Sequence, residues 1–203
     1  MGEDPLRPGG FLRVAGRAVL PGGTLTWSIA EGRRGRRIRS TLHDGNGLGL
    51  VVLLEVASDG RHTRLECATG SGLLTLHPEP DERSAHGNVV GHAGVRPLVL
   101  GWSPSHWLEI PGVPVVAATI FQGLASRVAV GGMIQVPLLV AGTDLGVTEA
   151  GATIHRLSGE RWELRRTDGS VVELELERDG VPRFEGFALE VGTWPLDASG
   201  SRA

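Results

Sequence analysis

The stretch from Ala152 to Val191 constrains the fold of this chain more than any other. Trp162 and Leu164 alternate there with charged residues, and a second alternating run follows the dipeptide Asp168-Gly169. Alternation with a period of two on both sides of Asp-Gly is the strongest short-range signal of a β-hairpin. One face of this hairpin is apolar, so other parts of the chain must cover it. On the solvated face, we expect ion pairs across the ladder from Arg165 and Arg166 to Glu173 and Glu175.

Strand-like runs recur through the rest of the chain at roughly the 8–12-residue spacing of antiparallel all-β domains. The predicted strands are 11–20, 24–30, 36–42, 48–57, 61–68, 73–77, 95–102 and 107–110. Residues 113–124 are apolar enough for a strand, although 116–125 could instead form a short helix that closes one end of the sheet. Pro137 indicates the edge or the start of a strand.

Composition fixes the fold class that these runs imply. The chain has 31 glycines and few helix-favouring stretches. Many short strands joined by glycine turns fit this composition better than a helical bundle does. We therefore predict an all-β fold: an antiparallel, strongly curved sheet or partly open barrel with at most one or two short helices.

Length and termini indicate one domain. The 203 residues contain no linker or repeat that divides the chain. We predict disordered ends at 1–10 and 197–203, around a β-rich domain at 11–196. The first residues carry acids and prolines where a signal peptide has a basic and then an apolar run. No apolar run approaches the roughly 20 residues of a membrane helix, so we expect a cytoplasmic protein without an integral membrane segment.

The arginine run Arg33–Arg39 is the one candidate contact for phosphate or nucleic acid. The net charge of −3 does not favour a polyanion partner. No aromatic residue that could stack on a base lies between Trp27 and Trp102. We interpret the run as a solvated strand face and expect no nucleic-acid partner, although one arginine could meet an anionic head group.

The sequence carries no motif for catalysis or for a cofactor. Cys67 is the only cysteine, which excludes an internal disulfide and a cysteine-based metal cluster. The run Gly45-Asn46-Gly47 lacks the spacing of a nucleotide loop, and Ser71 is not in a nucleophile-elbow motif. None of the seven histidines pair at the spacing of compact metal sites, and His86 and His92 are predicted in a flexible loop. We therefore expect no catalytic residue, metal or cofactor, with a metal site built from distant strands left open.

The most unusual local composition gathers two indoles and an imidazole around one turn. Trp102, His106 and Trp107 flank Ser103-Pro104. Such a group can line the mouth of an apolar cavity and orient a polar head group, or the indoles can simply plug the end of a barrel. We predict further wall residues on other strands and a polar contact from Arg39 or His155. The candidate ligand-binding residues are thus Trp27, Arg39, Trp102, His106, Trp107, His155, Trp162 and Phe184.

Three segments carry a resemblance to a known family. They are Leu25-Thr26-Trp27 before a Gly- and Arg-rich strand, Leu100-Gly101-Trp102-Ser103-Pro104, and the tail Val172–Phe187. Their order over most of the chain resembles a bacterial glycolipid-binding family whose fold is related to the lipoprotein-carrier half-barrels. The family's acidic pair before Ser-Pro is replaced by Leu98-Val99-Leu100, and the polar residues that usually follow are replaced by 105–107 and 115–117. The resemblance implies a β half-barrel and lipophilic cargo.

Three hypotheses follow for function. The first is a non-enzymatic domain that binds a hydrophobic or amphipathic, glycolipid-like ligand in the concave face of a curved sheet. The second is an interaction protein that forms a homodimer through its sheet. The third, less favoured, is an enzyme acting on a lipophilic substrate, for which a pair such as His106 and Glu109 inside a pocket would be needed.

Overall fold

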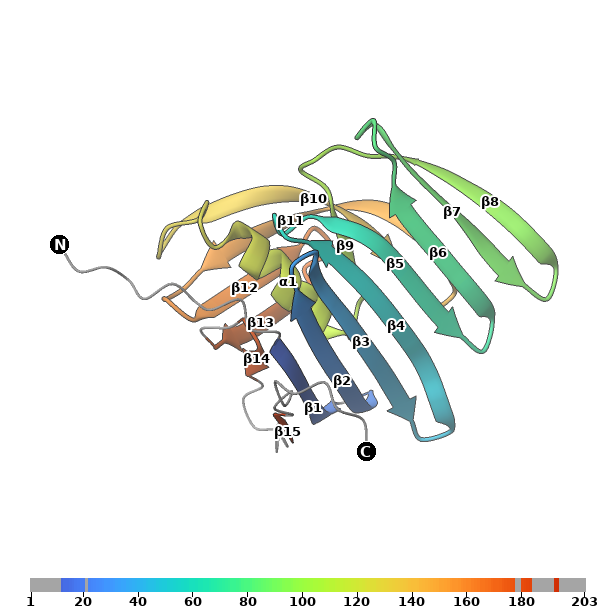
Figure 1. The fold of residues 1–203 in the computed structure, drawn as a ribbon, viewed down its shortest axis with the longest axis horizontal. Helices are drawn as coiled ribbons and strands as arrows, with labels where there is room; N and C mark the ends of the chain where they lie inside the picture. Colours follow the sequence, from blue (N-terminus) through green and yellow to red (C-terminus); the bar gives the residue numbers. More distant parts are fainter. Residues whose placement is uncertain (1–11, 21, 178–179, 184–191, 194–203) are drawn as a thin grey trace, which may run out of the picture.

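The computed structural model describes residues 12–20, 22–177, 180–183 and 192–193, which form two β-sheets and one helix (Figure 1). The predicted disordered ends, 1–10 and 197–203, lie outside the described residues. The larger sheet has nine strands in the order β15-β1-β2-β3-β4-β5-β6-β7-β8. Eight of these strands follow one another along the chain as an antiparallel meander. The bounds are β1 Leu12–Leu20, β2 Gly23–Gly32, β3 Gly35–Asp44, β4 Gly47–Ala57, β5 His62–Thr69, β6 Gly72–Pro78, β7 Ser84–Gly91, β8 Gly94–Gly101 and β15 Gly192–Thr193.

The second sheet has six strands in the order β14-β13-β12-β11-β10-β9. All its neighbours are antiparallel except β9 and β10, which are parallel. Pro137 lies in β10 immediately before Leu138, where the pairing with β9 begins, so it occupies an edge position as predicted. The bounds are β9 Trp107–Glu109, β10 Met133–Ala141, β11 Val147–Arg156, β12 Arg161–Arg166, β13 Val171–Leu176 and β14 Pro182–Arg183.

The apolar alternation of each strand faces a core between the two sheets. In β4, Leu50, Val52, Leu54 and Val56 are buried, whereas the residues between them are half-buried. The nearly continuous apolar run 48–57 is therefore a strand covered fully on one face. These observations confirm the predicted fold class, an antiparallel and strongly curved β-structure with one short helix.

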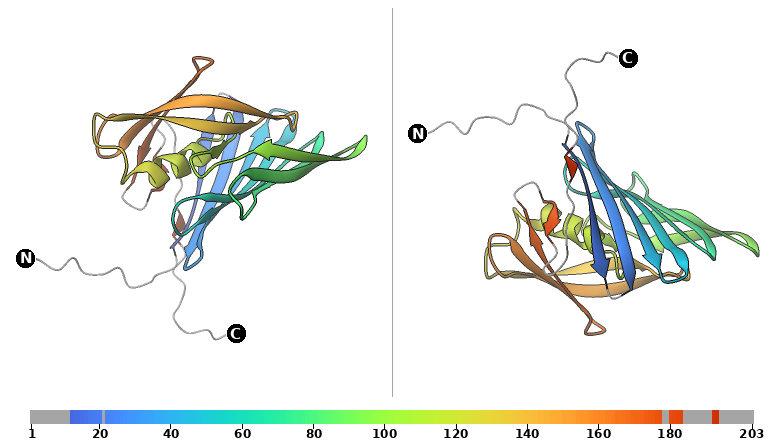
Figure 2. Two further views of the ribbon diagram at one scale, coloured as in Figure 1. Left: turned by 90° about the horizontal axis from the view of Figure 1, so that it is seen from above. Right: turned by 90° about the horizontal axis from the view of Figure 1, so that it is seen from below.

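The helix α1, Pro114–Leu124, fills the space between the sheets (Figure 2). Its first turn begins with Pro114, which suits a position where the backbone N–H has no helical partner. Eight of its residues are buried, because it packs against β3, β9, β13 and β14. Phe121 stacks on Trp162 of the second sheet with ring centroids 5.5 Å apart. Of the two alternatives for this segment, the helix is the correct one.

Glycines permit the close approach of neighbouring strands at two places that matter for the meander. At Gly72, φ is +142°, and a Cβ would lie 2.0 Å from the carbonyl oxygen of Val90. At Gly87, a Cβ would lie 1.9 Å from the carbonyl oxygen of Thr75. Because Gly87 lets β7 pair tightly with β6, His86 lies in a strand, opposite His77. The prediction of a flexible loop around His86 is therefore wrong, and His92 occupies the tight β7–β8 turn.

The hairpin that the sequence predicts at Asp168-Gly169 is formed by β12 and β13. Its register differs from the expected ion pairs, since Arg165 lies opposite Val171 and Arg161 lies opposite Glu175. The turn includes both Thr167 and Ser170, which moves the two arginines away from the glutamates. Arg165 instead pairs with Glu163 of its own strand at 3.2 Å.

Within the described part of the chain, no helix combines the length and the apolar character that crossing a membrane requires.

Candidate functional site

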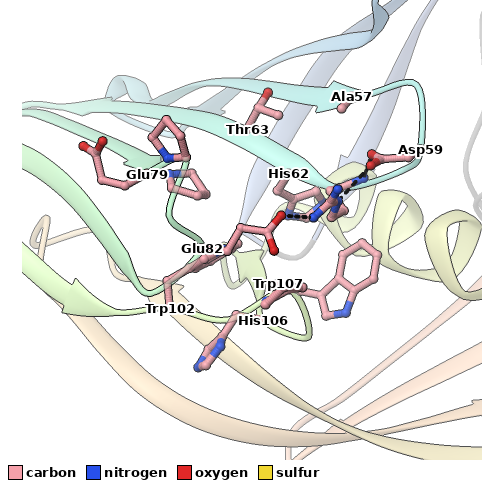
Figure 3. A pocket seen from close by; sticks show the side chains of 13 residues that line it. Ala57, Asp59, His62, Thr63, Glu79, Glu82, Trp102, His106 and Trp107 are labelled. Atoms are coloured by element: carbon pink, nitrogen blue, oxygen red, sulfur yellow. Dashed lines mark hydrogen bonds and ion pairs between the residues drawn. The ribbon is translucent and has the colours of Figure 1, made fainter.

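A cleft of about 250 Å³ opens at one end of the nine-stranded sheet (Figure 3). Its sides come from the β4–β5 turn, the start of β5, the connection from β6 to β7, and the segment between β8 and β9. In a meander, turns that follow every second strand lie at the same end of the sheet. This topology brings the β4–β5 turn and the β6–β7 connection together above the residues that precede β9.

The wall of the cleft is aromatic. Trp102 and Trp107 both line it, with exposed fractions of 9% and 4%. The His106 ring stacks on Trp102 with centroids 5.5 Å apart, and the His62 ring meets Trp107 edge-on at 5.1 Å. Prolines from the two flanking connections add further apolar surface. The two indoles are therefore largely buried and also form part of the cleft wall.

His62 belongs to the supporting structure of this wall. Its Nδ1 accepts a hydrogen bond from the Leu108 backbone N–H at 3.0 Å, and its Nε2 donates to Thr119 Oγ1 at 2.7 Å. Thr119 Oγ1 in turn donates to the Val116 carbonyl oxygen at 2.7 Å. Burial lowers the pKa of His62 to about 3, so the imidazole is neutral and both its nitrogens have partners. This one side chain therefore links β5, β9 and α1.

His106 is held by its own turn. Its Nδ1 accepts a hydrogen bond from the Ser103 backbone N–H at 3.0 Å and lies 2.8 Å from Ser103 Oγ. Ser103 Oγ also lies 2.8 Å from Ser105 Oγ. A serine nucleophile needs a base that a third group orients, together with donors for the oxyanion. The polar contacts here all fall within residues 103–106, which is the pattern of a closed turn.

Charged residues form the outer rim. Arg61 Nε donates to Asp59 Oδ2 at 2.8 Å, and its Nη1 donates to Glu82 across the cleft. The hydrogen bond from Arg61 holds the pKa of Asp59 below its usual value, and the hydrogen bonds to Asp59 and Glu82 raise the pKa of Arg61. Glu79 also lines the cleft, with Oε1 3.2 Å from His77 Nε2 and 3.7 Å from His86 Nδ1. The rim thus combines one guanidinium with three carboxylates.

The structure brings together three of the predicted ligand-binding residues, Trp102, His106 and Trp107. Trp27 is buried on the inner face of β2, and Trp162 packs on α1 and under Arg156, so both belong to the core away from the cleft. Two more lie on outer faces of the sheets, and one lies outside the described residues. These are Arg39, which is exposed on the face of β3 opposite to the buried Ile38 and Ser40; His155, which lies in β11 opposite Glu163 of β12; and Phe184.

Several cleft residues carried no site signal in the sequence. Asp59 belongs to a segment that reads as a turn, Arg61 begins the predicted strand 61–68, and Glu79 and Glu82 belong to a segment that reads as a polar loop. The signal that could have found them is strand order, because a meander places these two connections at the same end of the sheet.

Glu109 does not line the cleft with His106, so the structure does not bring this example pair of the enzyme hypothesis together in a pocket. The Glu109 carboxylate is buried and accepts hydrogen bonds from Arg166, at 3.1 Å from Nε and also from Nη2. Arg166 Nη1 donates to Ser170 Oγ at 2.7 Å. Burial raises the pKa of Glu109, and the hydrogen bond from Arg166 opposes this rise. The pair connects β9 to the end of β12 inside the core.

Comparisons with known proteins bear on the fold. No family model matches the chain, and no curated protein matches it. Among solved structures, a DUF1089 family protein from Pseudomonas aeruginosa is similar with a TM-score of 0.51 and 14% identity, covering 93% of this chain and 96% of that chain. A β-barrel-like protein of the domain of unknown function DUF1849 from Brucella abortus gives a TM-score of 0.47 and 10% identity, covering 91% of this chain and 98% of that chain. The first likeness extends over nearly the whole chain and shows that this β-fold is shared with a protein of very different sequence.

Proposed function

We propose that this domain binds a hydrophobic or amphipathic ligand without transforming it, and that the ligand's polar end occupies the cleft at Trp102, His106 and Trp107. The observation that carries the proposal is the cleft itself, an aromatic wall beneath a charged rim. A surface of this kind suits a molecule with an apolar body and a polar tip. The resemblance to glycolipid-binding proteins supports lipophilic cargo in the same sense.

The cleft is large enough to hold part of a ligand but not a whole lipid. Its volume of about 250 Å³ falls just below the range of roughly 300–1,000 Å³ typical of complete ligand pockets. A second hollow of about 300 Å³ lies on the other side of the β4–β5 turn and shares Ala57 and Asp59 with the first. A head group with a short apolar stem fits the cleft, and the rest of the molecule would extend from it.

The first test is native mass spectrometry of the purified protein, combined with organic extraction of whatever travels with it. We expect a discrete adduct that extracts into organic solvent, because the proposed cargo is lipophilic. Fluorescence titration with octyl amphiphiles adds a direct assay, since two of the tryptophans line the cleft. A protein that carries no adduct, and whose emission no amphiphile changes below its micelle concentration, would contradict the proposal.

Replacement of His106 by alanine is expected to weaken binding of the amphiphile that binds best by about three- to tenfold. The imidazole stacks on Trp102 at the cleft wall, and an aromatic contact contributes roughly 0.5–1.5 kcal/mol. The matched control is His155→Ala, which removes another half-buried histidine from the outer face of β11. Its affinity should stay within about twofold of the unmodified protein. Equal losses in both variants would place the ligand elsewhere.

Self-association is a second candidate function, supported by the outer face of β8. Val95 and Val99 are 66% and 69% exposed there, and β8 is an edge of the sheet among the described residues. Pro97 lies between them and lacks the N–H that a further strand would need for pairing. Two copies would therefore associate by packing the outer faces of their sheets and not by pairing their edge strands. Light scattering across a range of protein concentrations tests this candidate. A constant monomer mass would exclude it, and a dimer that Val99→Glu dissociates would establish it.

A further inference from the structure

We propose that the cleft selects a cationic head group, an amine or quaternary ammonium, over an anionic or a neutral one. The inference rests on the proposed function, because it names the head group that the same cleft would hold. Three independent properties of the cleft support it: the balance of charge at the rim, the engagement of its one arginine, and the aromatic character of its wall.

The charge balance at the rim is negative. Three carboxylates line the cleft, those of Asp59, Glu79 and Glu82, against the single guanidinium of Arg61. The His62 imidazole beneath them contributes no charge, since burial keeps it neutral. A cleft lined by an excess of one charge concentrates ligands of the opposite charge. The rim therefore favours a cation and repels a phosphate or carboxylate.

Arg61 is already engaged by two carboxylates of the rim. Its Nε donates to Asp59, its Nη1 donates to Glu82, and its backbone N–H donates to Asp59 Oδ1 at 3.1 Å. An anion at the guanidinium would lie beside these carboxylates and beside Glu79. The two ion pairs are exposed to solvent and so are weak enough to rearrange. A cation entering the cleft can share Glu82 and Asp59 with Arg61 without leaving any of the three charges unpaired.

The wall supplies the second kind of attraction that an organic cation uses. Trp102 and Trp107 present indole surface to the cleft, and indole is the side chain that binds cations most strongly over its face. A quaternary ammonium cannot donate hydrogen bonds, so aromatic surface and nearby carboxylates are the groups that recognise it. A neutral sugar could hydrogen-bond to the same rim side chains, but it would gain nothing from the negative charge balance of the rim.

The test compares three amphiphiles with the same octyl chain: octyltrimethylammonium, octyl glucoside and octyl phosphate, each below its micelle concentration. We expect octyltrimethylammonium to bind about tenfold or more tightly than either of the others, measured by tryptophan fluorescence and by calorimetry. If the glucoside or the phosphate binds as tightly, the cation inference is wrong and the proposed function stands. If none of the three binds, the proposed function fails with it.

Two variants at the rim should change the affinity for the cation in opposite directions, which a merely structural role of these residues would not do. Arg61→Ala should tighten octyltrimethylammonium binding about three- to tenfold, because it frees two carboxylates, and Glu82→Gln should weaken it by a similar factor. The controls are Arg64→Ala and Glu66→Gln, an ion pair within β5 that lies outside the cleft, which should change affinity less than twofold. Both rim effects should shrink at high salt. Weaker binding of the cation by Arg61→Ala would overturn the inference.

Discussion

Replacement of Arg166 by methionine is expected to lower the free energy of unfolding by about 3–5 kcal/mol. The Arg166 side chain is 9% exposed and the Glu109 side chain 2% exposed, so the variant would leave a carboxylate buried without its partner. A buried charge that has lost its counter-ion is costly, because neither water nor the protein solvates it. Urea unfolding followed by tryptophan fluorescence measures the loss.

The chain offers a matched control one residue away. Arg165 lies next to Arg166 in β12 but points to solvent and pairs with Glu163 at the surface. Arg165→Met should therefore change the free energy of unfolding by less than about 1 kcal/mol. The double variant Glu109→Met with Arg166→Met should recover most of the loss, because no buried charge remains. Equal stability of the two single variants would show that the Glu109 pair is not buried in solution.

The direction of the pH effect follows from the pKa of Glu109. Burial already raises this pKa above its ordinary value, and the hydrogen bond from Arg166 holds it down. Without Arg166, the folded-state pKa rises further. A carboxyl group with a higher pKa in the folded state than in the unfolded state stabilises the fold as the pH falls, since the folded state then binds the extra proton. The deficit of Arg166→Met should consequently shrink in acid.

How much of this molecule the sequence predicts depends on whether the information is local. The β12–β13 hairpin was predictable because the alternation of Trp162 and Leu164 and the Asp168-Gly169 turn all lie within a few residues of one another. The helix α1 was left as one of two alternatives, because a segment apolar on all sides has no periodicity to separate helix from strand. Its position between two sheets, which removes the polar face, is a property of the whole fold.

The candidate site divides in the same way. Trp102, His106 and Trp107 lie within six residues, so one turn brings them together. Arg61 and Glu82 meet them only through the order of strands in the sheet. The alternation of β3 already places Arg39 on the face opposite to Ile38, and therefore outside any space that the inner face encloses. Strand alternation in the sequence therefore already separates Arg39 from the residues of the inner face.

The unmodified protein is expected to lose about 4–5 kcal/mol of stability from one buried histidine as the pH falls from 6.5 to 3. The pKa of the His62 imidazole is about 3 in the folded protein, against an ordinary value of 6.5, because burial penalises the charged form. Below pH 6.5 the unfolded chain binds a proton at this residue that the folded protein excludes. The stabilising contribution is thus complete above pH 6.5 and is lost progressively as the pH falls towards 3.

The comparison with His62→Gln isolates this contribution from those of other groups. Glutamine can replace one of the two hydrogen bonds, to Leu108 N–H or to Thr119, but it does not titrate. The variant should be less stable than the unmodified protein at pH 7 by about 1–3 kcal/mol. The gap should then close by about 1.4 kcal/mol for each pH unit below 6.5, and in sufficiently strong acid the variant should become the more stable of the two. A difference in the free energy of unfolding that stays constant between pH 7 and pH 4.5 would show that burial does not lower the pKa of His62.

The low pKa of His62 also has a consequence for the cleft. His62 joins β5 to β9 through the Leu108 N–H and to α1 through Thr119, and its ring supports Trp107 at the cleft wall. Because the pKa is about 3 in the folded protein, the folded imidazole stays neutral at pH 4.5 and continues to accept from Leu108, although stability is already falling. Between pH 7 and pH 4.5, octyltrimethylammonium binding to the folded protein should therefore have the same pH dependence in the unmodified protein and in His62→Gln. A steeper loss of binding in the unmodified protein over this range would show that His62 takes up a proton in the folded state well above pH 3.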